Sequence, residues 1–198
     1  MDNNDGAYHF VDTVKTGLGL NELQSRSIKS FTSDYALYWF DYQGGYDTIF
    51  CEFGSNQSIT QAIDLCGGAA NMQNKTWRAI ITWTYDQPPY IENATAIYHD
   101  LTAAYTSGAK YEIIFDYPQV GDNPYGILTV QHFAALEKFW SNIPNFKVSS
   151  VPEAAFVLPH NYGWAMRNPQ DLIWGCGTQI TLRKRFGIFH VAFYQSTD

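Results

Sequence analysis

Two acidic residues, Glu52 and Asp116, stand near the carboxyl-terminal ends of short apolar runs, IFCEF and EIIFDY. If both runs are strands, side-chain alternation places Phe50 with Glu52, and Ile114 with Asp116, on a common face. Two strand spacings of roughly 4.8 Å would separate their backbones by about 10 Å, so inward-leaning side chains could reach one substrate. Two carboxyl groups in this arrangement can divide acid–base work, because one donates a proton while the other acts as base or nucleophile.

Each carboxylate also has a structural interpretation. Burying a carboxylate without a partner is costly, and a salt bridge or a helix N-cap would offset that cost as well as a catalytic role would. For Glu52, the structural alternative is a loop anchor that accepts backbone hydrogen bonds from the turn at 55–57. The sequence leaves both interpretations open.

The stretch from Trp77 to Pro118 predicts the elements that position these side chains. It reads as a strand at 77–84, a helix that ends near Gly108, and a second strand at 111–117. Both strands are apolar for most of their length, which is typical of parallel strands covered on both faces. In α/β folds, ligands bind at the carboxyl ends of such strands.

Equivalent strand positions recur along the chain, since Ile49, Ile80 and Ile113 lie 31 and 33 residues apart. This spacing predicts βα repeats, and right-handed crossovers then produce a parallel sheet with helices outside. The other predicted strands are at 47–53, 154–158 and within the terminal run GIFHVAFYQ. Five or six strands are therefore expected, fewer than the eight of a complete barrel.

Capping and stop signals predict the helices. Ser58 is a good N-cap for the helix after the strand at 47–53, and Thr129 for a later helix with Phe133, Leu136 and Trp140 on its buried side. One or two helical turns are expected at 36–42, stopped by the glycine pair that follows. The first 30 residues are polar and irregular, with a short strand predicted at 7–11.

The composition limits the class of protein. The chain has 198 residues, of which 45% are hydrophobic and 17% aromatic, enough for one sizeable core. With 16% charged residues and a net charge of −7, it lacks the basic surface that nucleic acids require. No apolar run is long enough for a membrane span, and the N-terminus has no signal-peptide pattern. We expect a soluble chain; sequons at Asn56, Asn74 and Asn93 leave an extracellular parent open.

The cysteines and histidines do not form a recognisable metal or redox motif. Cys51, Cys66 and Cys176 have spacings that match no zinc or redox pattern, and we interpret them as buried thiols. The histidines show no ligand spacing. We therefore expect neither a metal nor another cofactor.

Four segments together resemble a known family: IFCEFGSN, AIITWTY, AKYEIIFDYP with YGILTVQHFAALEKFW, and AAFVLPHNYGWAMRNPQDLIWG. They resemble the last third of a (β/α)8 barrel of glycoside hydrolase type, as in the β-galactosidase-like superfamily and in uncharacterised archaeal proteins of glycosidase type. The resemblance covers about residues 31–195. It implies an α/β fold with parallel βα repeats of TIM-barrel type, incomplete because it holds only about the C-terminal half of a barrel plus the start of a following α/β segment.

The resemblance also divides the chain into three parts. Residues 1–30 are a poorly defined N-terminal segment, 31–145 are barrel-like βα repeats, and 146–198 are a following strand-loop-strand segment. A full barrel typically needs about 250 residues, so the chain is a fragment, a reduced relative, or half of a homo-oligomer that completes the sheet. An unpaired barrel edge favours such self-association.

If the resemblance holds, the strand ends bind or hydrolyse glycans. Glycoside hydrolysis needs two carboxyl groups, for which Glu52 and Asp116 are the candidates. Further candidate binding residues surround them: Trp83, Tyr85, Asn56, Tyr117 and Asp34. Aromatic rings such as those of Trp83 and Tyr85 stack on the apolar face of a sugar, although they also occur as core or rim residues. On this resemblance residues 77–85 are barrel strand seven, after which the family usually has its nucleophilic carboxylate. Here that strand ends in Trp83-Thr84-Tyr85, with Asp86 only beyond it.

Two functions follow as hypotheses, with carbohydrate as the expected partner. The first is a glycoside hydrolase-like, carbohydrate-active protein. The alternative is a non-catalytic module that binds glycans or another chain through its aromatic-rich face. Turnover of an aryl glycoside separates them.

Overall fold

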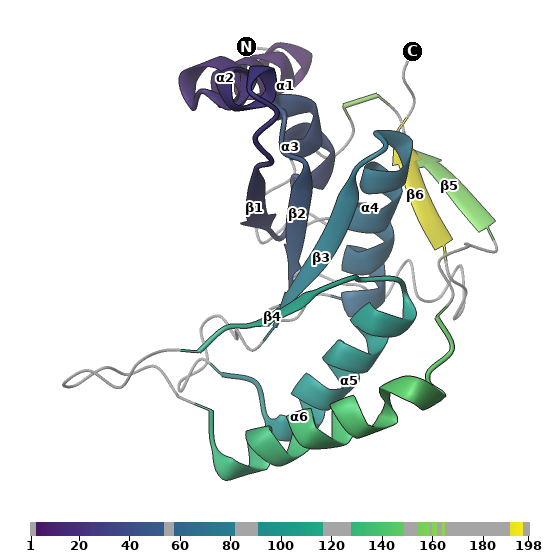
Figure 1. The fold of residues 1–198 in the computed structure, drawn as a ribbon. Coiled ribbons are helices and arrows are strands. Elements are labelled where there is room, and N and C mark those ends of the chain that lie inside the picture. The colour runs from purple at the N-terminus through teal and green to yellow at the C-terminus, as the bar shows by residue number, and fades with distance from the viewer. Residues whose placement is uncertain are drawn as a thin grey trace.

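The computed structural model describes residues 3–53, 58–81, 91–116, 128–148, 154–158, 160–161, 164 and 191–195 (Figure 1). The chain is a mixed α/β protein in which strands and helices alternate around a four-stranded parallel sheet. This confirms the predicted fold class at the level of parallel βα repeats.

The main sheet has the order β1-β2-β3-β4, the same as the order of its strands in the sequence. Each neighbouring pair is parallel. The strands are β1 (Phe31–Asp34), β2 (Thr48–Glu52), β3 (Thr76–Ile81) and β4 (Glu112–Ile114). The helices between them are α3 (Tyr38–Gly44), α4 (Ile59–Met72) and α5 (Ala94–Thr106).

Local signals place the helix ends where the sequence predicts them. The Ser58 side chain accepts a hydrogen bond from the Gln61 N–H and caps α4. Gly45 ends α3 with a φ of 124°, a conformation that glycine adopts without strain. Thr129 caps α6 (Val130–Asn142) in a capping box with His132, and a short 3₁₀ turn at Ile143–Asn145 follows.

The N-terminal segment contradicts the predicted strand at 7–11, because it is helical. It forms α1 (Asn3–Asp12), a π-helical turn (Thr13–Gly17) and α2 (Leu20–Ser25). The α1 helix packs on Trp164: a Cβ added at Gly6 would lie 2.6 Å from the indole Nε1, and the Phe10 ring lies 5.1 Å from the indole. These tertiary contacts outweigh the weak local preference.

The buried side of α6 also differs from the prediction. Leu136 is buried as expected, but Phe133 and Trp140 are 59% and 64% exposed. The buried residues are instead His132, which the capping box holds inward, and Phe139, which contacts Tyr105 edge to face at 6.0 Å. The cap and the contacts with α5 together orient α6 so that its most apolar stripe does not face the interior.

The two faces of the main sheet have different surroundings. On one face Ile49, Cys51, Ala79 and Ile81 are fully buried, and α3, α4 and α5 contact the sheet there. The alternate residues of the same strands are half-buried or exposed, with Phe31 exposed by 68%. The expectation that these strands are covered on both faces is therefore not met in the part of the chain described, whereas helices do lie outside one face. We call the second face the open face.

The last two strands form a separate parallel pair. They are β5 (Ala154–Leu158) and β6 (Val191–Gln195), which confirms strands in both predicted places. In Figure 1, β6 lies beside α4, and contacts between the two elements agree. Across the ranges described, no helix has the length and apolar character required to cross a membrane.

Candidate functional site

The open face presents its side chains in three rows that run across the strands. The register aligns Phe50 of β2 with Ser33 of β1 and Arg78 of β3. Tyr111 continues this row, because it precedes Glu112, which pairs with Ala79. We call Ser33, Phe50, Arg78 and Tyr111 the central row. The row before it holds Phe31, Thr48 and Thr76, and the row after it holds Glu52, Ile80 and Ile113.

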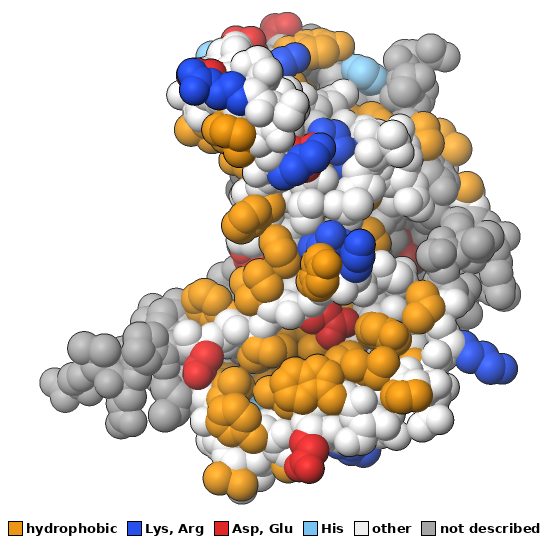
Figure 2. Space-filling view, in the orientation of Figure 1, with side chains coloured by type: hydrophobic (Ala, Val, Ile, Leu, Met, Phe, Trp, Pro, Cys, Tyr) orange, Lys and Arg blue, Asp and Glu red, His pale blue; other side chains and the backbone are white. Residues whose placement is uncertain are grey.

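Aromatic rings lie on both sides of Arg78 on this face. The Phe31 and Phe50 rings meet edge to face with centroids 5.6 Å apart. The Arg78 guanidinium carbon lies 4.6 Å from the centroid of the Tyr111 ring, a cation–π distance. Tyr111 is 60% exposed. Figure 2 shows hydrophobic side chains gathered over the strands, with cationic side chains among them.

Hydroxyl groups alternate with the rings. The Thr48 and Thr76 hydroxyl oxygens lie 2.8 Å apart and form a hydrogen bond across the first row. Since the open face combines rings, hydroxyls, a guanidinium and a carboxyl group, it suits a ligand that is partly apolar and partly hydrogen-bonding.

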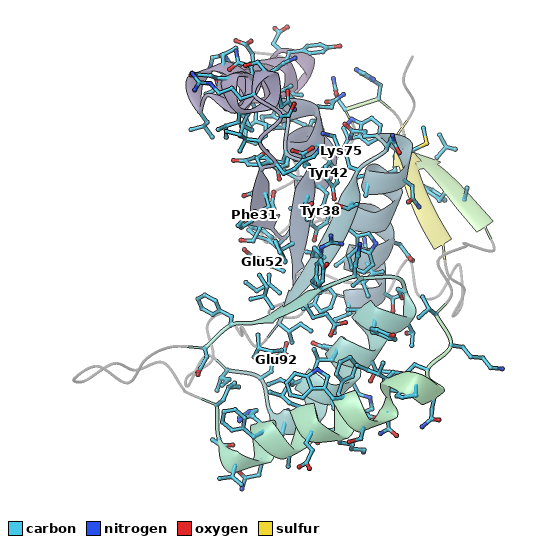
Figure 3. The ribbon with its side chains drawn as sticks, in the orientation of Figure 1. Phe31, Tyr38, Tyr42, Glu52, Lys75 and Glu92 are labelled. Carbon is cyan, nitrogen blue, oxygen red and sulfur yellow. The ribbon has the colours of Figure 1, made fainter. Side chains whose placement is uncertain are left out.

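Glu52 lies on the open face at the carboxyl end of β2, one row beyond Phe50 (Figure 3). Its side chain is half-buried. The register places it level with Ile80 and Ile113. This position, at the carboxyl edge of a parallel sheet, is the one that the sequence predicts.

Asp116 lies three residues beyond Ile113, the β4 residue that is level with Glu52. At about 3.3 Å per residue, this adds roughly 10 Å along the strand to the two strand spacings between them. β4 ends at Ile114, so Asp116 lies beyond the strand and outside the rows of the open face. The structure therefore does not bring Glu52 and Asp116 together. Asp116 instead accepts a hydrogen bond of 3.0 Å from the Leu128 N–H, just before α6.

Asp34 has a structural position at the start of α3. Its carboxylate accepts hydrogen bonds from the N–H groups of Tyr35, Ala36 and Leu37 at 2.6, 3.1 and 3.0 Å. These donors belong to the turn between β1 and α3, so Asp34 holds that turn; the N-cap residue of α3 itself is Leu37. The predicted binding residues Trp83, Tyr85, Asn56 and Tyr117 lie outside the described residues.

Sequence reasoning missed a pair of buried carboxyl groups at the start of α5. Glu92 and Asp100 hydrogen-bond to each other through their side chains. Burial, followed by the charge of Asp100, raises the pKa of Glu92 to about 9. Burial also raises the pKa of Asp100 to about 6. The pair therefore shares a proton at neutral pH.

A histidine joins this pair to α6. The Thr129 N–H donates to Nδ1 of His132, so the neutral ring carries its hydrogen on Nε2 and donates it to the Glu92 carbonyl at 2.7 Å. The sequence does contain a signal for the pair, because Asp100 falls on the apolar stripe of α5 with Ile97 and Leu101. One oxygen of each carboxyl group, Oε2 of Glu92 and Oδ2 of Asp100, is buried without any other hydrogen-bond partner.

A third carboxyl group, that of Glu112, is half-buried, with its Oε1 atom fully buried. Burial raises its pKa to about 8. Glu112 pairs in register with Ala79, which belongs to the covered face. It therefore contributes to the interior and not to the open face.

Cys51 and Cys66 are fully buried thiols, as predicted, whereas Cys176 lies outside the described residues. The Cys51 thiol donates to the Tyr38 hydroxyl at 3.2 Å. Burial raises the pKa of both Cys66 and Tyr38 well above the ordinary values. These groups therefore stay protonated and unreactive. The described residues contain no cluster of three His, Cys, Asp or Glu side chains suited to a metal ion.

Comparison of the chain with protein-family models, curated proteins and solved structures found no match in any of the three. The geometry of the open face is therefore the basis for inferring a function.

Proposed function

We propose that the chain binds a glycan on the open face of its parallel sheet. The observation that carries this proposal is the exposed set of rings, with Phe31 and Tyr111 at 68% and 60%, interleaved with hydrogen-bonding side chains in adjacent rows. A sugar has an apolar ring face and a rim of hydroxyl groups, so it matches both kinds of side chain at once.

The strands hold these side chains in fixed positions. Phe31 and Phe50 project from neighbouring strands whose backbones are hydrogen-bonded, and their rings already contact each other before a ligand binds. A preformed surface loses little conformational entropy on binding. Glu52, at the carboxyl end of β2, supplies a carboxylate that accepts hydrogen bonds from sugar hydroxyls.

The sheet itself supports a barrel-type architecture. Its strand order follows the sequence and its contacting helices lie on one face, as in a wall of a (β/α)8 barrel; a doubly wound sheet has helices on both faces. Closed barrels fill their interior mostly with bulky branched residues. Here the corresponding face carries Thr48, Thr76, Arg78 and Glu52, which suits contact with a polar ligand.

Binding is favoured over hydrolysis by the position of the carboxylates. Hydrolysis needs two carboxyl groups about 5–10 Å apart on either side of one glycosidic bond. The positions of Glu52 and Asp116 do not support such a pair, because Asp116 lies beyond the end of β4 and its carboxylate accepts a hydrogen bond from the Leu128 N–H. From the glycoside hydrolase-like resemblance, our proposal therefore keeps the sugar ligand and leaves out the hydrolysis.

The test compares two exposed phenylalanines by glycan microarray and calorimetry. Phe31→Ala removes a ring from the open face, whereas Phe133→Ala removes one of similar exposure, 59%, from α6. Losing a stacking ring should weaken glycan binding by about 2- to 10-fold. We expect this loss for Phe31→Ala alone, with the melting temperature of both variants close to wild type.

Several outcomes would contradict the proposal. If the folded chain binds neither neutral nor acidic glycans, or if Phe133→Ala weakens binding as much as Phe31→Ala, the open face is not a glycan site. If the chain self-associates with increasing concentration and Phe31→Ala weakens that association, the open face binds a second copy of the chain. If the chain hydrolyses aryl glycosides and Glu52→Gln abolishes this activity, the function is hydrolysis and not binding alone.

A further inference from the structure

Arg78 is the centre of the open face. It projects from β3, an interior strand of the sheet, and lies in the central row between Phe50 and the Tyr111 ring. The guanidinium carbon lies 4.6 Å from the centroid of the Tyr111 ring, and on the other side the register pairs Arg78 with Phe50 of β2. Any ligand that stacks on these rings would therefore contact the guanidinium.

The positive charge of Arg78 is not neutralised by a carboxylate of the described residues. The three ion pairs there are Arg26–Glu22, Lys29–Asp47 and Lys75–Asp47. Arg78 donates through Nη1 to the carbonyl of its neighbour Trp77 at 3.1 Å, which leaves other guanidinium donors for a ligand. Lys110 adds a second cation, since its Nζ lies 5.8 Å from the centroid of the same Tyr111 ring.

We propose that the glycan bound on the open face is acidic and that a uronic-acid carboxylate of this glycan binds the guanidinium of Arg78. This inference rests on the proposed glycan-binding function and deepens it. A planar guanidinium can donate two parallel hydrogen bonds to a carboxylate, and such charge-assisted bonds are stronger than neutral ones. A uronic acid carries its carboxylate on the sugar ring, so one residue can stack on an aromatic ring and reach Arg78.

A carboxylate fits the surroundings better than a sulfate-rich chain does. The protein has a net charge of −7, and Glu52 stands one row from Arg78 on the same face. A polyanion of high charge density needs a cluster of cations to neutralise it. The described open face offers one guanidinium with Lys110 beside it, which matches a single carboxylate per bound sugar residue.

The experiment uses two ligands that differ only in charge: an oligogalacturonide and its methyl ester. Calorimetry on the full chain should give the oligogalacturonide an affinity about tenfold or more above that of the ester. Arg78→Gln should remove this difference, because it should weaken binding of the oligogalacturonide more than binding of the ester. Arg78→Lys, which keeps the charge without the planar fork, should keep part of it. Arg26→Gln is the matched control, because Arg26 is an exposed arginine paired with Glu22 on α2.

The outcomes separate this inference from the proposed function. Equal affinity of wild type for both ligands would overturn the acidic specificity and leave glycan binding in place. Binding of dextran sulfate as tight as that of the oligogalacturonide, and lost in Arg78→Gln, would overturn the choice of a carboxylate. No binding of either ligand, or of any neutral glycan, would remove both proposals. Circular dichroism of each variant confirms that a lost affinity does not reflect unfolding.

Discussion

The two faces of the main sheet come from the same strands but carry different chemistry. On the covered face, Ile49, Cys51, Ala79 and Ile81 are all 0% exposed and pack under the helices. On the open face, the alternate residues are aromatic, charged or hydroxylated. Because strand side chains alternate, one peptide segment can supply a hydrophobic core and a polar ligand surface. Mutations on the two faces should therefore affect stability and binding separately.

The largest expected effect is on the covered face. Ile81→Ala removes a fully buried side chain and should lower the free energy of unfolding by about 2–5 kcal/mol, because it loses apolar burial and leaves a cavity. Ile80→Ala, on the adjacent half-buried position of the open face, should cost only about 1 kcal/mol. Urea denaturation of both variants measures the difference. Equal losses would show that the open face is packed against something in solution.

A second prediction concerns the buried carboxyl groups on the helix side of the sheet. The pKa values of Glu92 and Asp100, about 9 and about 6, exceed the ordinary values, so the folded chain holds protons that the unfolded chain loses above about pH 4.5. These groups therefore stabilise the fold most below that pH, and their contribution is lost as the pH rises toward about 9.

The measurement is the melting temperature between pH 6 and 9. Wild type should lose several degrees over this range. Glu92→Gln, which stays neutral throughout, should show a weaker dependence; the slope that remains is expected from Glu112, whose pKa burial raises to about 8. Identical slopes in wild type and Glu92→Gln would contradict the buried pair.

The smallest expected effect tests how α4 covers the sheet. A Cβ added at Gly67 would meet the Trp77 indole Nε1 at 3.5 Å, an ordinary contact. Gly67→Ala should therefore raise the free energy of unfolding by about 0.5–1 kcal/mol, because alanine is the better helix former. Gly6→Ala provides the contrast, since its Cβ would lie 2.6 Å from Trp164 and should destabilise α1. Calorimetric melting gives the sign of each effect, and a loss for Gly67→Ala would mean closer packing of α4.

Many element boundaries were predictable because local chemistry sets them. Ser58 and Thr129 cap α4 and α6, and Gly45 ends α3, each through bonds or backbone angles within a few residues. The repeat spacing likewise predicted parallel strands joined by helices, which the sheet order confirms. Such signals are readable because both partners lie close together in the chain.

Features that depend on distant partners were missed or misplaced. The α1 helix depends on Trp164, more than 150 residues away from Gly6, and the orientation of α6 depends on contacts with α5. For the pair of Glu92 and Asp100 the sequence holds one signal, the carboxyl group of Asp100 on the apolar stripe of α5. That Glu92 is its partner depends on the path of the chain just before α5.

The sequence alone determined which residue types stand at the strand ends, and it placed Glu52 at the carboxyl edge of a parallel sheet. Only the tertiary structure decided which side chains share a row and a face, because strand register is fixed by hydrogen bonds between segments about 30 residues apart. Asp116 lies three residues beyond Ile113, the β4 residue that is level with Glu52. The same register brings Phe50, Arg78 and Tyr111 into one row, which no spacing in the sequence shows.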